Sequence, residues 1–462
     1  MNKITDFSRT IVALATALGS GSIAVIRMSG QDAIEIINKI FPGKNLEKVQ
    51  ANTIHYGKIL DRDREFDHVM VSVFHSPHSY TGENYIEISC HANPFIIDDI
   101  IGVLMNYGAK PARSGEFTLR AFLNGKLDLS QAKAVAGIIQ AKSRVGIKNS
   151  LEQLNGRLTS RIMQLRQQLI DIIALMEIDL DFSEEEIEII QNAQLIARLH
   201  KIEKDLKDLG ATNNYAKLLE GGIQLAIIGE PNVGKSTLLN QLLGENRAIT
   251  SHIPGTTRDT LHENIVINDV VIKLVDTAGL RKTRDELESE GIKRTKSQAA
   301  QADIVLVVVD TSIPISDDSL SLIKKSLGWI KGQVLLVANK MDIGLSEGNQ
   351  KKLSSLNKPL ISISAITGEG LTQLEKSIVE QVSRGFEKYS DDLIITSRRQ
   401  TEVLKKTTNH LLEASSVLEN DGGFEFAVVD IRQALNVLGE ITGETVTEDI
   451  LNNIFENFCI GK

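Results

Sequence analysis

The stretch that decides the fold reads GEPNVGKS at residues 229–236. It fits the phosphate-loop pattern GxxxxGK[ST] and lies between a buried-strand run, Gly222–Ile228, and a helical run, Thr237–Leu243. Glycines let the backbone amides curl around phosphate oxygens, while Lys235 would meet the β- and γ-phosphates and Ser236 would ligate Mg²⁺. We therefore expect this strand–loop–helix unit to belong to a doubly wound α/β domain that binds a nucleotide.

Two motifs at the ends of later strand-like runs extend this site. In DTAG at residues 276–279, the Asp276 carboxylate can hold a magnesium-bound water and the Gly279 amide can meet the γ-phosphate. In NKMD at residues 339–342, Asp342 can accept from the N1 and N2 hydrogens of guanine, a pattern that adenine lacks. The second motif therefore predicts selection of GTP over ATP.

Two further segments complete the set. Thr257, within GTTRD at residues 255–259, is the natural second magnesium-ligating hydroxyl of a switch that orders with the γ-phosphate. The dipeptide SA at residues 364–365 follows the strand-like run Leu360–Ile363 and would close over the base. Five motifs in this order predict a GTPase that requires GTP and Mg²⁺. The motif residues expected to contact the nucleotide are Asn232, Val233, Gly234, Lys235, Ser236, Thr237, Gly255, Thr256, Thr257, Asp276, Thr277, Ala278, Gly279, Asn339, Lys340, Asp342, Ser364 and Ala365.

One position departs from signalling GTPases, many of which place a glutamine after the DxxG glycine to orient the attacking water. This chain has Leu280 there, which accepts no hydrogen bond, so another group must position the water. Acidic residues follow, although a solvated helix face is the expected role of any single one. They are Asp285, Glu286, Glu288 and Glu290.

Length and composition limit the classes of protein open to this chain. Its 462 residues suggest two to four domains, and 42% hydrophobic with 24% charged residues is ordinary for a globular protein. No apolar run approaches the roughly 18 residues that cross a bilayer, so no membrane association is expected. Two cysteines cannot form a disulfide framework, which favours a cytoplasmic location. The net charge of −9 excludes a surface that is basic throughout but permits a local RNA-binding patch.

The secondary-structure pattern expected from the sequence changes three times along the chain. Residues 1 to about 120 mix short β-rich runs with helical stretches, as in an α+β domain. Ser130–Tyr215 is proline-free and helical, residues 220–380 alternate strands with helices, and helical texture returns after about residue 385. An α/β domain inserted into one discontinuous helical domain explains this order, and two separate helical domains are the alternative.

The chain resembles the MnmE (TrmE) family of tRNA-modification GTPases. FCIGK at residues 458–462 is similar to the family's terminal C-x-G-K signature. GEFT at residues 115–118 and RAFLNGKLDL at residues 120–129 are similar to its hinge between the first domain and the helices. GTTRD at residues 255–259 and DTAGL at residues 276–280 have the family's form. The resemblance covers essentially the whole chain and favours the insertion.

The resemblance implies a multidomain α+β fold with three parts. Residues 1–124 would form an N-terminal α/β domain for tetrahydrofolate binding and dimerisation. Residues 125–217 and 385–462, which end in CIGK, would form the discontinuous helical domain. Residues 218–384 would form an inserted Ras-like α/β G domain.

The resemblance also implies a function that the motifs alone do not. MnmE proteins are homodimers that act with an FAD-dependent partner, MnmG (GidA), in a heterotetramer. Together they add an aminomethyl or carboxymethylaminomethyl group to carbon 5 of the wobble uridine of certain tRNAs. A folate, 5-formyltetrahydrofolate, supplies the one-carbon unit, so this chain is expected to bind tRNA and folate.

Four residues match the family's folate contacts: Arg27, Glu87, Lys126 and the terminal Lys462. Arg27 and Lys126 could meet the glutamate tail, and Glu87 can pair with the donor edge of a pterin. Without the resemblance, Arg27 and Glu87 would be ordinary strand-end surface charges. HANP at residues 91–94 replaces the commoner HGGP at the edge of this pocket.

The resemblance implies a potassium ion where other GTPases insert an arginine finger, across a dimer of G domains. Its expected ligands are Asn232, Ser251, Ile253 and Thr256. The same loop is expected to contact GTP through Ser251, His252, Ile253 and Pro254, the last standing where many members have a small residue. Glu288 aligns with the residue that positions the attacking water.

The two cysteines receive different predictions. Cys459 lies three residues from the chain end, where an exposed thiol is expected. In the family this cysteine is needed for modification but not for GTP hydrolysis, which makes it a candidate catalytic residue; a buried small hydrophobe is the alternative. Cys90 and His91 are adjacent in a strand and should point to opposite faces, so Cys90 is expected to be structural.

A local basic excess is the candidate tRNA-contacting face, with a solvated helix face equally expected. It comprises Lys133, Lys142, Arg144, Lys148, Arg157, Arg161 and Arg166, against the single acid Glu152. Two other function classes compete with the tRNA-modifying enzyme. One is a regulatory GTPase that acts as a ribosome or RNA assembly switch, and the other is a folate-dependent aminomethyltransferase that acquired a G domain.

Overall fold

The computed structural model divides into two compact units, described separately here. The first unit comprises Met1–Ile139, Ser150–Lys207 and Glu402–Lys462, and the second comprises Gln140–Asn149 and Asp208–Thr401. The structure describes residues 8–17, 19, 21–141, 143–181, 191–215, 222–245, 263–268, 270–275, 296–297, 299–344, 346–383, 393–420, 422–456 and 458–461.

The first unit begins with a six-stranded sheet in the order β3-β4-β5-β2-β1-β6. Its neighbouring strands run antiparallel except for the pair β1 and β6. The strands are β1 (Ile11–Leu14), β2 (Ile23–Ser29), β3 (Thr53–Asp61), β4 (Arg64–Phe74), β5 (Tyr85–His91) and β6 (Lys110–Pro111). Helices α1 (Ala33–Ile40) and α2 (Pro94–Asn106) and the short 3₁₀ turn η1 (Leu46–Lys48) complete this region.

The core of this region lies between the sheet and helices α1 and α2. Strand β4 alternates buried and exposed residues along most of its length, as expected of a strand with one solvated face. The inward positions pack with the apolar sides of α1 and α2 in one cluster that includes Ile37, Val71 and Ile100. The expected mixture of short strands and helices in this region is confirmed.

Helices α3 (Glu116–Leu123) and α4 (Leu129–Gln140) connect this sheet to the helical region. Buried residues of α3 and α4 pack against α17 (Glu448–Phe455), close to the end of the chain, in a cluster that includes Leu119, Leu129 and Phe455. The sequence segments 116–132 and 451–458 therefore share one small core, which ties the C-terminus to the start of the helical region.

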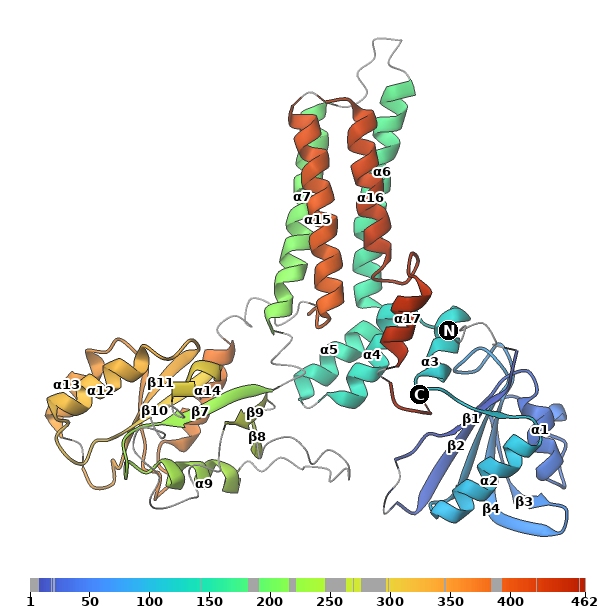
Figure 1. Cartoon of the computed structure of the whole chain (residues 1–462), viewed down its shortest axis with the longest axis horizontal. Helices are drawn as coiled ribbons and strands as arrows, with labels where there is room; N and C mark the ends of the chain where they lie inside the picture. Colours follow the sequence, from blue (N-terminus) through green and yellow to red (C-terminus); the bar gives the residue numbers. More distant parts are fainter. Residues whose placement is uncertain are drawn as a thin grey trace. The chain divides into compact units, whose positions relative to one another are not determined.

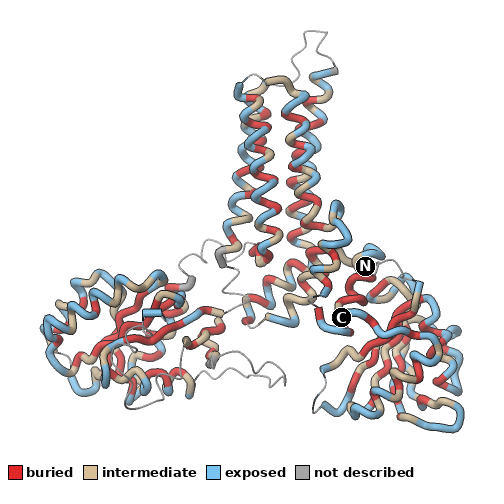
Figure 2. The backbone as a smooth tube through the Cα atoms, in the orientation of Figure 1, coloured by how far each residue is buried: buried red, intermediate tan, exposed pale blue. Residues whose placement is uncertain are grey.

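A bundle of four long helices completes the first unit. It comprises α6 (Arg157–Asp181), α7 (Asn192–Ala211), α15 (Arg398–Glu419) and α16 (Phe424–Gly439), which lie side by side in Figure 1. Their buried residues recur at three- and four-residue spacing, as at Leu195, Leu199, Ile202 and Leu206 of α7. Figure 2 shows buried segments alternating with exposed ones along each of these helices. The last residues of α7 and the first residues of α15 belong to the second unit.

The second unit is built on a six-stranded sheet in the order β12-β11-β10-β7-β9-β8. Its strands are parallel except for the edge strand β8. They are β7 (Ile223–Ile228), β8 (Glu263–Ile267), β9 (Val270–Leu274), β10 (Ile304–Asp310), β11 (Gln333–Asn339) and β12 (Leu360–Ser362). The helical elements are α5 (Arg144–Leu154), the 3₁₀ turn η3 (Thr212–Tyr215), α9 (Lys235–Glu245), α12 (Asp317–Leu327), α13 (Glu347–Ser354) and α14 (Leu371–Ser383), with the second half of α5 in the first unit.

Both faces of this sheet are covered. Helices α9 and α14 supply the core on one face, and α12 and α13 supply the core on the other. The central strand β10 is buried at every position but its last, Asp310, as expected for a parallel strand between two helical layers. This is the doubly wound α/β domain expected around the phosphate loop, and its sequence interrupts the helical region between α7 and α15. The predicted fold class is therefore confirmed.

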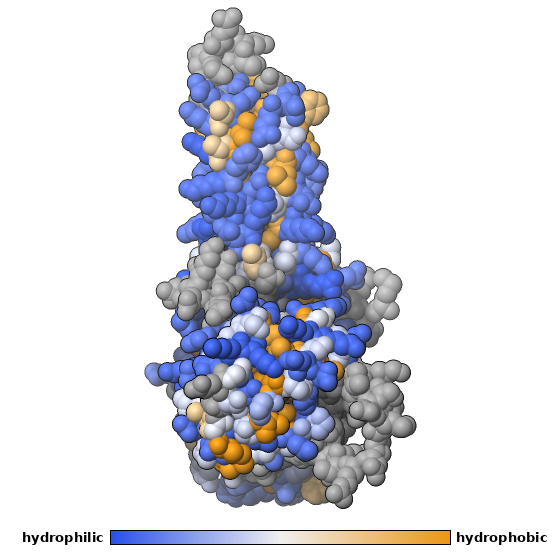
Figure 3. Space-filling model, turned by 90° about the vertical axis from the view of Figure 1, so that its left-hand side faces the viewer, coloured by the Kyte–Doolittle hydropathy of each residue, from blue (hydrophilic) through white to orange (hydrophobic). Residues whose placement is uncertain are grey.

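The side of the molecule drawn in Figure 3 is mostly hydrophilic, with apolar side chains in small groups. Among the described helices, none combines the length and the apolar character that a bilayer crossing requires.

Candidate functional site

The phosphate loop joins β7 to α9 and carries the backbone geometry that its motif predicts. Gly234 has φ of 94°, and a Cβ added there would lie 2.2 Å from Nδ2 of Asn339. Asn232 has φ of 63°, a left-handed conformation that asparagine tolerates better than most residues. Lys235 and Ser236 open helix α9, so its N-terminal amides and positive dipole end face the loop. The loop is therefore formed as an anion-binding cradle.

The side chain of Lys235 folds back over this loop. Its Nζ donates to the backbone oxygens of Gly229 at 3.0 Å and Glu230 at 2.6 Å. Burial lowers the pKa of the Lys235 ammonium, while the Glu230 carboxylate acts to raise it. A partly desolvated ammonium held at the mouth of the cradle gains more from a phosphate than one in bulk water would.

Asn339 connects the phosphate loop to the segment expected to hold the base. Its side chain is 2% exposed, and its Nδ2 donates to the backbone oxygen of Val233 at 2.8 Å. Its Oδ1 accepts from the backbone nitrogen of Ala365 at 2.9 Å. One amide therefore links two segments, one 106 residues before it and one 26 residues after it along the chain.

Lys340 and Asp310 form a second connection, one that sequence reasoning missed. Lys340 has φ of 71° and its Nζ lies 2.6 Å from Oδ2 of Asp310, the last residue of β10. Burial acts to raise the pKa of the Asp310 carboxyl, but hydrogen bonds from Lys340 and Ser312 outweigh it and lower the pKa. The sequence shows that Asp310 ends an apolar run, but only the structure shows that this strand lies beside the one that ends at Asn339.

The remaining described residues of the predicted site lie at the same edge of the sheet. Asp342 is exposed, with its carboxylate at the surface, whereas Ser364 and Ala365 are buried directly after β12. Ser364 Oγ accepts from the backbone nitrogen of Thr367, which holds this turn in shape. The carboxyl ends of β7, β11 and β12 thus bring together the phosphate loop, the NKxD motif and the SA dipeptide.

Several predicted residues lie outside the residues that the structure describes. They are the loop Ser251, His252, Ile253, Pro254, Gly255, Thr256 and Thr257, the motif Asp276, Thr277, Ala278 and Gly279, the acidic residue Glu288, and the terminal Lys462. The second magnesium hydroxyl, three of the four potassium ligands and the candidate water-positioning residue therefore remain predictions. Ser236 and Asn232 are the described members of those two sets, and both are exposed.

A separate cavity of about 290 Å³ in the first unit contains two of the expected folate contacts. It is lined by Arg27, Phe74, Tyr80, Tyr85, Glu87 and Val135. Arg27 and Glu87 face each other across β2 and β5, and Nε of Arg27 donates to Oε1 of Glu87 at 2.9 Å. The hydroxyl of Tyr85 donates to the same carboxylate oxygen at 3.3 Å, and burial raises the pKa of that phenol. Apolar rings with one carboxylate and one guanidinium suit a flat, polar-edged ligand.

The C-terminal segment reaches this cavity. Nη1 of Arg27 donates to the backbone oxygen of Gly461 at 3.2 Å. Ile460 forms an antiparallel bridge with Ser114, and the backbone nitrogen of Gly115 donates to the oxygen of Cys459 at 3.4 Å. The CIGK segment is therefore laid against the N-terminal region, and the Cys459 thiol is exposed as expected.

Lys126 differs from its prediction in one respect. It is exposed and is not among the residues that line the cavity. Its Cε would lie 3.3 Å from a Cβ added at Gly82, which places it beside the loop that precedes β5. Arg27 and Glu87 are thus brought together, while Lys126 is not brought to the same cavity.

Cys90 behaves as a structural residue. It is 3% exposed, and burial together with the Asp67 carboxylate raises its pKa to about 11. His91 is exposed on the opposite face and its Nδ1 lies 2.7 Å from Oδ1 of Asp67. The two side chains do not form a nucleophile pair, as the alternation of the strand predicts.

Much of the basic excess in the helical region is paired within the chain. Arg157 contacts Glu152 at 3.5 Å, Arg161 contacts Asp205 at 2.8 Å, and Arg166 contacts Glu444 at 2.7 Å. Lys148 and Arg144 are exposed in the second unit. Intramolecular pairing therefore accounts for part of the excess, which neither interpretation predicted.

Comparisons with known proteins cover nearly the whole chain. Two family models match it: the GTP-binding protein TrmE N-terminus at residues 10–126 and the MnmE helical domain at residues 129–459. The tRNA modification GTPase MnmE of Christiangramia forsetii is 41% identical over 473 residues and covers 98% of this chain and 99% of its own. That of Thermotoga maritima is 40% identical over 457 residues and covers 98% of this chain and 100% of its own. Among solved structures, the G domain of the T. maritima FeoB iron transporter is 30% identical and matches 34% of this chain and 98% of its own length. The TM-score of that match is 0.26.

Proposed function

The chain belongs to the MnmE family of tRNA modification GTPases, and from this premise we propose that it modifies carbon 5 of the tRNA wobble uridine with a folate one-carbon donor. The attached group would be an aminomethyl or carboxymethylaminomethyl group. An FAD-dependent partner of the MnmG (GidA) type would supply the redox chemistry. The observation that carries the proposal is full-length similarity combined with a nucleotide cradle and an Arg27–Glu87 cavity in one chain.

The GTP site is proposed to use the cradle as it stands. When GTP binds, the Lys235 ammonium would contact the triphosphate in place of the two backbone oxygens to which it donates in this structure. Ser236 and Thr257 would ligate Mg²⁺, whose charge stabilises the developing negative charge on the phosphates. Asp342, exposed at the sheet edge, would read the guanine, with Ser364 and Ala365 closing over the base.

The hydrolysis step is proposed to depend on potassium. Asn232, Ser251, Ile253 and Thr256 would hold the ion, which substitutes for the charge of an arginine finger. Glu288 would position the attacking water in place of the glutamine that Leu280 replaces. The exposed, left-handed Asn232 supports this assignment, because its side chain stands at the loop surface where an ion can reach it.

The folate site is proposed to be the cavity of the first unit. Glu87 accepts from Arg27 and Tyr85, and a carboxylate with this role can pair with the donor edge of a pterin while the rings of Tyr80 and Tyr85 supply apolar contact. Lys126 and Lys462 would meet the glutamate tail from outside the cavity. The exposed Cys459 would act in modification and not in GTP hydrolysis.

The domain boundaries and the assembly follow as proposals from the same premise. Residues 1–124, 125–217 with 385–462, and 218–384 would be the folate-binding, helical and G domains. The N-terminal domains would form the homodimer, and two MnmG-type subunits would complete a cytoplasmic heterotetramer that binds tRNA. GTP hydrolysis would drive association and dissociation of the G domains and thereby reorganise the modification site.

Mass spectrometry of wobble uridines tests the proposal most directly. A deletion strain should lack the modified uridines, and plasmid-borne wild-type protein should restore them. If wobble uridines carry the same modifications in the deletion strain and the complemented strain, the proposal is wrong and a regulatory GTPase of ribosome or RNA assembly is favoured.

A comparison of GTPase rates in KCl and NaCl at equal ionic strength tests the ion. We expect faster turnover in potassium, and Asn232→Ala should remove the difference. Equal rates in the two salts would withdraw the potassium assignment while leaving the tRNA chemistry open.

A further inference from the structure

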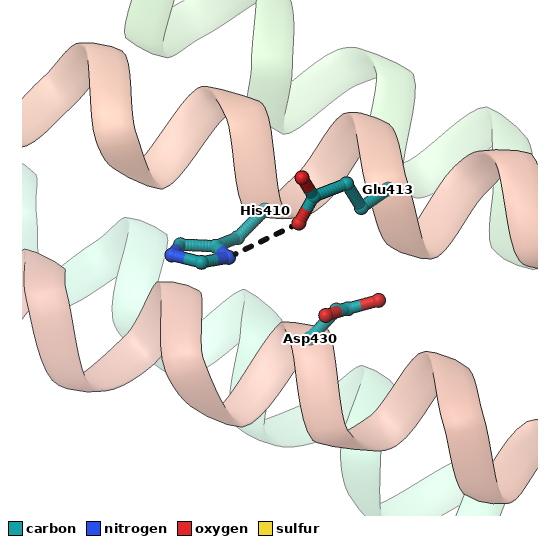
Figure 4. A group of neighbouring side chains, drawn as sticks. All are labelled: His410, Glu413 and Asp430. Carbon is teal, nitrogen blue, oxygen red and sulfur yellow. Dashed lines mark ion pairs between the residues drawn. The ribbon is translucent and has the colours of Figure 1, made fainter.

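A cluster of three potential metal ligands lies between two helices of the bundle. His410 and Glu413 come from α15 and Asp430 comes from α16. Figure 4 shows the His410 and Glu413 side chains extending from one helix toward Asp430 on its neighbour. One potential ligand atom from each residue lies within 4.8 Å of the others. None of the three residues belongs to a motif of the GTP or folate sites.

The helix geometry explains why these residues meet. His410 and Glu413 are three residues apart, so they share one face of α15. Helix α16 begins at Phe424, only a few residues after α15 ends at Glu419, and the two form a hairpin. Asp430 lies about as far after that turn as Glu413 lies before it, which brings the three to one level.

One potential ligand atom of the cluster, Nδ1 of His410, lacks a hydrogen bond within the described residues. Nδ1 of His410 lies 3.4 Å from Oε2 of Glu413, yet this buried nitrogen makes no hydrogen bond in the described part of the chain. Burial and the neighbouring Glu413 carboxylate raise the pKa of Asp430, while His410 lowers it. Two carboxylates lie beside one imidazole, and a buried nitrogen that makes no hydrogen bond calls for an explanation such as a bound ion.

We propose that His410, Glu413 and Asp430 bind one divalent transition-metal ion such as Zn²⁺. An imidazole nitrogen with two carboxylate oxygens matches the ligands of Zn²⁺ and its first-row neighbours, whereas Ca²⁺ and Mg²⁺ prefer oxygen alone. Ligands about 2.1 Å from a tetrahedral ion lie roughly 3.4 Å apart, close to the separation of the His410 and Glu413 atoms. The ion would place a positive charge between the two carboxylates and link α15 to α16, with water completing its coordination.

The test is Zn²⁺ binding by the full-length, tag-free chain after removal of metal, measured by calorimetry and by metal analysis after dialysis. We expect Asp430→Asn and His410→Gln each to lose one bound Zn²⁺ per chain or to weaken that site by roughly tenfold or more. Co²⁺ in place of Zn²⁺ should give visible absorption bands in the wild type that both variants lack.

His200→Gln is the matched control. His200 also pairs with a glutamate on the bundle, Nε2 lying 3.6 Å from Oε1 of Glu419, and both side chains are about half exposed. It has no third ligand in the described part of the chain, so Zn²⁺ binding should match the wild type. Equal binding by the wild type and Asp430→Asn, or no binding by the wild type, would overturn the proposal.

Thermal unfolding separates a metal site from an ion pair. In metal-free buffer, Asp430→Asn should melt at or above the wild-type temperature, because it removes one of two facing carboxylates. Added Zn²⁺ should raise the melting temperature of the wild type and not of the variant. A variant that melts lower without metal and responds equally to Zn²⁺ would show that Asp430 is structural, and would also overturn the proposal.

Discussion

Asn339 shows how one side chain can hold a nucleotide site together. It is buried, and it joins the phosphate loop through Val233 to the base-side segment through Ala365. Asp342, three residues on, is exposed and makes its expected contact only with the nucleotide. Two residues of one motif therefore differ physically: Asn339 positions the site, and Asp342 is the residue that we propose reads the base.

We predict that Asn339→Ala lowers both stability and GTP affinity. It leaves the Val233 oxygen and the Ala365 nitrogen without their partner, at about 1 to 3 kcal/mol for each buried group. Thermal unfolding and titration with a fluorescent GTP analogue measure the two effects. Asp342→Ala is the comparison and should weaken GTP binding with little change in melting temperature; equal melting temperatures for both variants would contradict the positioning role.

The folate cavity gives a second prediction at this scale. Arg27→Ala should weaken binding of 5-formyltetrahydrofolate strongly, because Arg27 orients the Glu87 carboxylate inside the cavity. Lys126→Ala should weaken it less, since Lys126 is exposed outside the lining. Equilibrium dialysis with each variant ranks the two residues, and a larger loss for Lys126→Ala would move the ligand out of the cavity.

Helix α3 carries a buried network of ion pairs at the point where the N-terminal sheet meets the helical region of the first unit. Arg120 and Glu116 are each 1% exposed and lie 3.0 Å apart. Arg120 also contacts Glu83 at 2.9 Å, and Arg9 contacts Glu116 at 3.4 Å. Burial acts to raise the pKa of Glu116, but hydrogen bonds from Arg113 and Arg120 outweigh it, and the pKa falls below its usual value.

The lowered pKa of Glu116 predicts that acid weakens the folding stability of the first unit. A carboxyl whose pKa is lower in the folded state stabilises the fold at pH values above its unfolded-state pKa, here 4.5. This stabilisation is lost as the pH falls through the folded-state pKa. Glu116→Gln should therefore destabilise the chain at pH 7 and flatten the decline of stability below about pH 4.5. Urea unfolding at several pH values measures this, with the exposed Glu65→Gln as a control that should change little.

The sequence was informative wherever a local pattern carried the physics. The buried runs of β7, β10 and β11 and the phosphate loop were predicted because strand burial and glycine geometry are readable over a few residues. The pairing of Lys340 with Asp310 was not, since it depends on the order of strands in the sheet. Arg27 and Glu87 were identified only through resemblance, because a charged residue in a strand looks alike in a cavity and at a surface.

The helical region shows the same limit. The spacing of apolar residues predicted long helices, but the meeting of His410, Glu413 and Asp430 depends on the register of two helices across their turn. Counting basic residues suggested a tRNA face, whereas Arg161 and Arg166 find acids that are distant in sequence. The sequence shows how many charged residues a region has, but the three-dimensional structure is needed to show which of them form ion pairs.

At the scale of the whole molecule, the first and last segments of the chain depend on each other. Residues 459–461 contact Gly115, Ser114 and Arg27, and α17 packs against α3. The phosphate-loop domain lies between these segments in sequence and belongs to the second unit. The nucleotide cradle and the C-terminal segment are therefore expected to respond separately to mutation.

Deletion of residues 459–462 tests this separation. We predict weaker folate binding and loss of tRNA modification, because Arg27 loses its contact with Gly461, while GTP affinity stays near the wild-type value. Cys459→Ser keeps those backbone contacts and should retain folate binding while losing modification. Loss of GTP binding in the deletion variant would contradict the independence of the two sites.

The position of Gly461 has a consequence for how the protein is made. It is buried with φ of 90°, and any Cβ there would lie 2.2 Å from the backbone oxygen of Leu14. The N-terminal sheet can fold on the ribosome, but the cavity beside Arg27 stays incomplete until Gly461 has been synthesised and has left the exit tunnel. A product truncated before residue 459 would keep the nucleotide cradle and lack the finished cavity, so synthesis of the CIGK segment would be the step that completes this cavity.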